Sequence, residues 1–93
     1  MKVSIEISGE NTDKWIFSVK IIQDEKEYQY SVFVSKDYYK ELVNEKIPPV
    51  TLVERSFSFL LNREPPSSIL KEFNLKQIED YFSEYRKEIV KYL

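Results

Sequence analysis

Carboxylates near the C-terminus are the side chains in this sequence whose type and spacing could support acid–base chemistry. The acids are Glu79, Asp80, Glu84 and Glu88. Two carboxylates on one helix face can act as a general acid and a general base. These acids, however, alternate with basic residues such as Arg86 and lie opposite the apolar positions of the same segment. That pattern is typical of a solvated, ion-paired helix face, so we expect no catalytic role for them.

Arg63, which precedes Glu64 and Pro65, is the candidate for binding an anion. A guanidinium group can hold a carboxylate or a phosphate through two parallel hydrogen bonds. Arg63 also falls in the last turn of a predicted helix, where a cation is favoured by the helix dipole. There it can pair with Glu64 or with Glu72. We favour this structural role and keep an anion contact as the alternative.

Three of the seven tyrosines, Tyr28, Tyr30 and Tyr38, are candidates for an interaction surface. Aromatic rings can stack on bases or line a groove. They also suit the edge of a core, where the ring is buried and the hydroxyl stays hydrated. Because no excess of basic residues surrounds them, we predict a core edge or a dimer contact.

The composition narrows the chemistry. The chain has no Cys and no His, which removes thiol chemistry, disulfides, the usual zinc sites and imidazole catalysis. We therefore predict no catalytic residue, no cofactor and no metal. The net charge of −2 has no basic segment to attract phosphates, so a nucleic-acid partner is disfavoured. No apolar run reaches membrane-spanning or signal-peptide length, so we expect a cytoplasmic protein with no membrane partner.

Alternation of apolar and polar residues predicts the elements of the N-terminal half. Three such stretches predict strands at about residues 2–8, 13–22 and 28–34. Short links between them predict an antiparallel meander. A sheet this small is not stable with both faces in water, so helices have to cover one of them. The alternation does not decide which face is covered.

The rest of the chain predicts three to four helices, at about residues 36–44, 50–62, 66–73 and 75–92. Ser35 suits the N-cap of the first, and Pro48-Pro49 separate it from the second. The last run is open to a break near Ser83, where serine could cap a new helix. The predicted class is α+β: a three-stranded antiparallel meander followed by helices packed on one face, within one domain spanning 1–93.

The helix at about 50–62 carries the widest apolar surface of the chain. Its apolar positions are Leu52, Val53, Phe57, Phe59, Leu60 and Leu61. A surface this wide predicts contacts on two sides. The helix start is open between Pro49 as the first residue and Thr51 as an N-cap with Glu54. Further on, Asn74 and Gln77 have the spacing of a capping box.

The last half of the chain carries a distinctive residue pattern. It reads FLLNREP at 59–65, SIL at 68–70, then Phe73, Leu75, Ile78 and YFSEY at 81–85. This pattern resembles a family of small uncharacterised bacterial proteins. The family pattern has proline after the Tyr-Phe pair, where this chain has Ser83. Because the family has no assigned activity, the resemblance implies no catalytic residues.

The order of the elements also matches a different class of protein. A strand at 28–34 followed by two helices is the layout of the ribbon-helix-helix, whose paired strands enter the DNA major groove. Neither face of that strand carries Arg or Lys, and the preceding strand would compete for the edge that the dimer needs. We therefore expect a non-enzymatic module that acts through protein–protein contact, as a homodimer or an accessory subunit. A ribbon-helix-helix-like DNA-binding regulator is the alternative.

Overall fold

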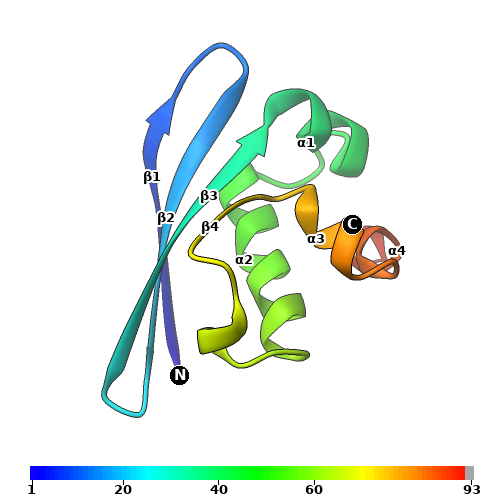
Figure 1. Cartoon of the computed structure of the whole chain (residues 1–93). Helices are drawn as coiled ribbons and strands as arrows, with labels where there is room; N and C mark the ends of the chain where they lie inside the picture. The colour runs from blue at the N-terminus through cyan, green and yellow to red at the C-terminus, as the bar shows by residue number, and fades with distance from the viewer. Residues whose placement is uncertain (92–93) are drawn as a thin grey trace.

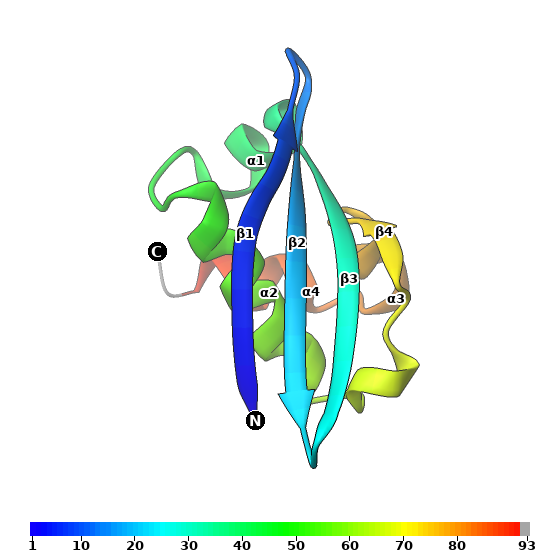
Figure 2. The same ribbon diagram turned by 90° about the vertical axis from the view of Figure 1, so that its left-hand side faces the viewer.

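The computed structural model describes residues 1–91 as two layers, a twisted sheet and a set of helices on one of its faces (Figures 1 and 2). The elements are β1 (Lys2–Glu10), β2 (Lys14–Gln23), β3 (Lys26–Ser35), α1 (Lys36–Val43), α2 (Pro49–Leu61), the 3₁₀ turn η1 (Pro66–Ser68), β4 (Glu72–Asn74), α3 (Gln77–Tyr81) and α4 (Tyr85–Val90). The predicted α+β class is confirmed. So is the antiparallel pairing of β1 with β2 and of β2 with β3.

The sheet has the strand order β1-β2-β3-β4. In the registers, Ile5 lies opposite Val19 and Phe17 lies opposite Val32, so the apolar residues of the meander share one face. Phe17, Val19 and Val32 are almost completely buried beneath the helices. The structure thus decides what the alternation left open: the helices cover the face that carries these side chains. The opposite face, which carries residues such as Ser18, is open to solvent (Figure 2).

The first helix begins where the sequence predicts. The Ser35 hydroxyl accepts a hydrogen bond from the Tyr38 N–H at 3.2 Å, which satisfies one of the free donors of the first turn of α1. The second helix begins at Pro49, and Pro48 occupies the N-cap position without a side-chain hydrogen bond. Pro49 therefore provides the start of α2, and Thr51 lies inside the first turn.

The second helix contacts neighbours on two sides, as its wide apolar surface predicts. On the sheet side the Phe57 ring lies 5.4 Å from that of Tyr30 and 6.0 Å from that of Phe73, measured between ring centroids. On the other side the Phe59 ring packs edge-on against Tyr85 at 5.2 Å. Figure 1 shows α2 between the sheet and α4. The helix is therefore the centre of the core.

The predicted helix at 66–73 is wrong. Proline at 66 starts a single 3₁₀ turn, Ile69 is extended at φ −80° and ψ 133°, and the chain then forms β4 parallel to β3. The backbone completes the pairing: Ser31 N–H donates to Lys71 O at 2.8 Å, and Leu75 N–H donates to Phe33 O at 2.9 Å. The apolar residues of this segment have helical spacing, but in the extended chain Phe73 packs on the core and Leu70 is 50% exposed.

The predicted long helix at 75–92 is broken near Ser83, as the sequence allowed. Phe82 is extended at φ −128° and ψ 99° and separates α3 from α4. The N-cap position of α4 is Glu84, so Ser83 is not the cap. The capping box is half formed: the Gln77 side chain accepts from the Asn74 N–H at 2.8 Å, but α3 begins at Gln77 rather than after Asn74. Residue 92, the last of the predicted helix, lies outside the described part.

Candidate interaction surfaces

Arg63 has a structural environment. Its Nε donates to the Glu84 carboxylate at 3.2 Å, and an Nη donates to the Phe59 carbonyl at 3.0 Å in the last turn of α2. Its guanidinium also stacks over the Phe59 ring at 3.6 Å. The cation at the helix end is therefore present, but its partner is Glu84, not Glu64 or Glu72. With these contacts made, Arg63 is not poised to grip an anion bidentately.

The three candidate tyrosines belong to the core or its edge. Tyr30 is 4% exposed and its hydroxyl donates to the Pro66 carbonyl at 2.6 Å, while Tyr28 is half-buried beside the same cluster. Tyr38 is 5% exposed, and its hydroxyl has no hydrogen-bond partner in the described residues 1–91. Burial raises the pKa of Tyr38, and the neighbouring Glu79 carboxylate raises it further. The rings of Tyr30 and Tyr38 thus belong to the core, and Tyr28 packs at its edge.

The acidic C-terminal face is paired with basic groups. Arg86 Nε and Nη2 bind the two carboxylate oxygens of Glu79 at 3.3 and 3.2 Å, and Arg86 Nη2 also lies 3.5 Å from Glu41 on α1. The hydrogen bonds from Arg86 lower the pKa of Glu79 below its ordinary value. A carboxylate with a lowered pKa that is paired to arginine is a poor general acid or base at neutral pH. The arrangement joins α1, α3 and α4.

Within residues 1–91, no three side chains of the metal-binding types gather into a group that could hold an ion. No helix in the same residues is long and apolar enough to cross a membrane.

The strand that the ribbon-helix-helix hypothesis needs as a free ribbon has neighbours on both edges. β3 pairs with β2 over its whole length on one side and with β4 at residues 31–33 on the other. A ribbon-helix-helix dimer needs one edge of this strand for the partner chain. Nothing in the fold favours that arrangement.

The outer edge of β1 is the feature that the sequence analysis missed. β1 lies at the edge of the sheet, and in the described part of the chain only β2 pairs with it. Two of its helix-facing side chains are incompletely covered: Val3 is 39% and Ile7 57% exposed. Val50, at the start of α2, is 39% exposed as well. The alternation of residues 2–8 predicted the strand, but not that its apolar side would stay uncovered.

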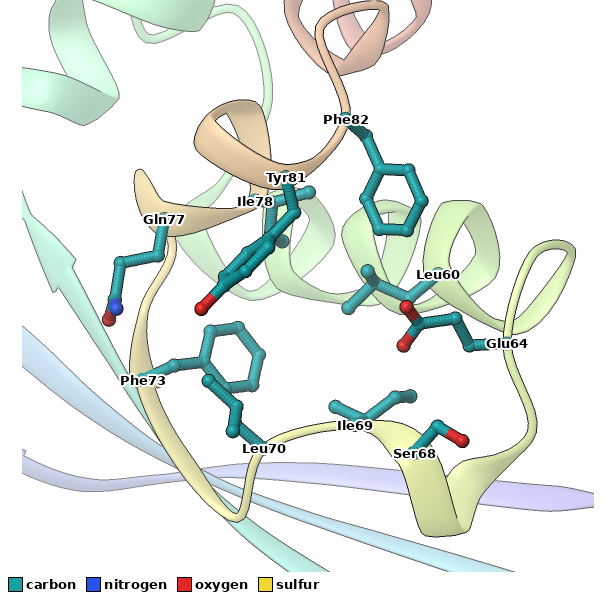
Figure 3. A pocket seen from close by; sticks show the side chains of 10 residues that line it. All are labelled: Leu60, Glu64, Ser68, Ile69, Leu70, Phe73, Gln77, Ile78, Tyr81 and Phe82. Atoms are coloured by element: carbon teal, nitrogen blue, oxygen red, sulfur yellow. The ribbon is translucent and has the colours of Figure 1, made fainter.

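A second feature that was missed is a hollow at the opposite side of the fold. It lies between the end of α2, the η1–β4 segment and α3, and Figure 3 shows the side chains that line it. Its walls are mostly apolar, and its volume is about 170 Å³. It depends on the extended course of residues 69–74, which the sequence had predicted as helix.

No family model, curated protein or solved structure matches this chain. The resemblance of its C-terminal half to a family of small bacterial proteins therefore stays a prediction.

Proposed function

We propose that this chain is a non-enzymatic, cytoplasmic interaction module that forms a homodimer through antiparallel pairing of β1 with β1 of a second copy. The observation that carries the proposal is the free edge of β1. Natural sheets protect such edges with proline, with charges that point inward, or with a covering segment. Residues 3–7 have no proline and no charge on the helix-facing side, and they present an unpaired row of backbone groups.

The charges of β1 favour a second copy as the partner. Lys2 lies near its beginning and Glu6 lies past its middle, both on the outer face. Antiparallel pairing of two copies brings the basic end of each strand beside the acidic end of the other. Opposite charges across paired strands contribute about 0.2–1 kcal/mol each. The strand is thus complementary to itself.

The bulge in β1 and the charges of the strand limit the register in which two copies can pair. The bulge between Ile7 and Gly9 restricts regular pairing to about the first half of the strand. Two-fold axes at Ser4 or at Ile5 place Val3, Ile5 and Ile7 against apolar residues of the other copy. An axis at Glu6 would place two carboxylates opposite each other, which is destabilising. Lys2 lies directly opposite Glu6 of the second copy when the axis is at Ser4, and diagonally from it when the axis is at Ile5.

Sedimentation equilibrium at micromolar protein concentration tests the dimer. We expect a dimer for the parent chain and a monomer for Ile7→Lys, because the introduced ammonium group would have to be buried in the paired sheet. The matched control is Leu70→Lys, since Leu70 is 50% exposed but lies beside β4, at the opposite edge of the sheet from β1. It should dimerise as the parent does. A rise in the dissociation constant of roughly tenfold or more corresponds to about 1.4 kcal/mol.

A charge exchange tests the antiparallel arrangement itself. Lys2→Glu should weaken the dimer, because it gathers like charges at each end of the paired strands. The double variant Lys2→Glu with Glu6→Lys should restore it, since the attraction is recovered with reversed signs. A parent chain that is monomeric throughout contradicts the proposal. A Leu70→Lys variant as disruptive as Ile7→Lys, or a double variant that restores nothing, contradicts the proposed interface.

A further inference from the structure

The hollow beside β4 is walled by apolar side chains from three segments (Figure 3). Leu60 comes from α2, Ile69 and Phe73 from the η1–β4 segment, and Ile78 from α3. These four side chains are buried, so the walls are fixed by the core rather than by mobile surface groups. The hollow is open to solvent on one side.

Its size selects the kind of occupant. The volume is about 170 Å³. An apolar cavity of about 150 Å³ holds one benzene-sized group, whereas sites for drug-sized ligands and cofactors occupy roughly 300–1,000 Å³. The hollow therefore accommodates one large apolar side chain and is too small for a nucleotide or an extended cofactor.

Exposed apolar side chains at the rim of the hollow enlarge the surface that a partner can contact. Leu70 is 50% exposed and Tyr81 is 69% exposed, and both line the opening. Large apolar side chains exposed around a pocket are typical of interaction sites. A free small molecule seated inside would leave most of this rim in water. A polypeptide that inserts one side chain can cover it.

The charge of the partner follows from Glu64. Its side chain lies at the wall of the hollow, between Leu60 and Ile69 in Figure 3. Glu64 is half-buried, and its carboxylate has no hydrogen bond or ion pair within residues 1–91. The adjacent Arg63 does not neutralise it, because Arg63 binds Glu84. A half-buried, unpaired carboxylate favours a cation beside it.

We propose that this hollow binds a partner polypeptide that inserts one large apolar side chain (Leu, Met or Phe) and pairs an adjacent Lys or Arg with Glu64. The sheet order β1-β2-β3-β4 places this site beside the strand at the opposite edge from β1. Both surfaces can thus be occupied at once. The inference goes beyond the proposed dimer and does not depend on it, since a monomer would present the same hollow.

Amide NMR titration with matched capped peptides tests the site. The probes are Ala-Phe-Lys-Ala and Ala-Phe-Glu-Ala, with Leu and Met in place of Phe in a second series. We expect the Lys peptides to shift resonances of Ile69, Leu70, Ile78 and Tyr81, and the Glu peptides to bind several-fold more weakly. Shifts that appear in β1 instead, equal binding of both charges, or no shift at all would overturn the proposal.

Two variants separate this site from a general charge effect. Glu64→Lys should reverse the preference, so that the Glu peptides bind more tightly than the Lys peptides. The matched control is Glu54→Lys, an exposed position on α2 that does not line the hollow. It should leave the preference unchanged. If Glu64→Lys leaves the preference unchanged, Glu64 does not select the partner. If free phenethylamine binds as tightly as the Phe-Lys peptide, the occupant is a small amine and the polypeptide assignment is wrong.

Discussion

At the residue scale, the most informative side chains are Tyr85 and Tyr38. Both hydroxyls are buried, but only that of Tyr85 makes a hydrogen bond to another side chain. Ser56 in α2 is fully buried, and its hydroxyl donates to the Leu52 carbonyl at 2.7 Å. Since that uses its one hydrogen, the Tyr85 hydroxyl at 2.6 Å is the donor to Ser56. The Tyr38 hydroxyl is also buried but has no hydrogen-bond partner in the described chain. Both tyrosines have pKa values raised by burial.

These surroundings predict different costs for the same chemical change. Tyr85→Phe should lower the free energy of unfolding by about 1 kcal/mol, because it removes a buried hydrogen bond and leaves Ser56 without its donor. Tyr38→Phe should change it by less than about 0.5 kcal/mol, or raise it, because the hydroxyl is already unpaired. Urea unfolding followed through the single tryptophan, Trp15, measures both. Equal losses in the two variants would contradict this assignment.

At the element scale, the C-terminal segment is two short helices joined by an extended residue. Phe82 is extended at φ −128° and ψ 99°, close to the extended region to which proline restricts the residue before it. The backbone N–H of Ser83, the next residue, donates no hydrogen bond within residues 1–91. Proline is also what the resembled family pattern has at this position.

Ser83→Pro should therefore be tolerated. We expect it to leave the free energy of unfolding unchanged or to raise it by about 0.4–1 kcal/mol, through the reduced entropy of the unfolded chain. The matched control is Glu88→Pro inside α4, which removes the hydrogen bond from the Glu88 N–H to the Glu84 carbonyl and should destabilise the protein by about 3 kcal/mol if that helix is formed. Thermal unfolding of both variants measures the difference. A large loss in Ser83→Pro would mean that the helix continues through this position.

The contact between Arg86 and Glu79 joins the short helices α3 and α4 and has a pH dependence. Because the pKa of Glu79 in the folded protein is lowered from its ordinary value of 4.5, the carboxylate contributes stability above that pH. The contribution is lost as the pH falls through the lowered folded value. Glu79 is 21% and Arg86 40% exposed in their side chains, so the magnitude is that of a partly screened pair.

Glu79→Gln tests this contact. The variant should be less stable than the parent by about 0.5–1 kcal/mol at neutral pH, and the difference should shrink when unfolding is measured at a pH below the lowered pKa. The control is Asp80→Asn, a neighbouring exposed acid on α3. It should change stability little at either pH. A Glu79→Gln difference that persists unchanged in acid would mean that the carboxylate is not the stabilising group.

At the scale of the whole molecule, the helix layer leaves part of the apolar side of the sheet exposed. The apolar side chains of β2 and β3 on the helix-facing side are mostly buried, whereas β1 has an unpaired outer edge and keeps Val3 and Ile7 partly in solvent. If β1 pairs with a second copy as proposed, the dimer is the more stable form. The thermal midpoint of the parent should then rise with protein concentration, and that of Ile7→Lys should not. A midpoint independent of concentration would argue against the dimer.

The amino-acid sequence by itself determined the elements that depend on neighbouring residues. Alternation in residues 2–8, 13–22 and 28–34 predicted the meander, and Ser35 and Pro49 marked the starts of α1 and α2. These features follow from side-chain period, capping and proline geometry, which act over a few residues. The break near Ser83 was also visible, as a residue suited to interrupt a helix.

Only the tertiary structure decided the rest, because it depends on partners far apart in the chain. Residues 72–74 form a strand since β3 offers them backbone hydrogen bonds, and an apolar spacing alone does not distinguish this from a helix. Arg63 pairs with Glu84 rather than with a nearby acid for the same reason. Which face of the sheet is covered, which edge stays free, and the hollow beside β4 all arise from how the two layers meet. The two proposed surfaces belong to this second group.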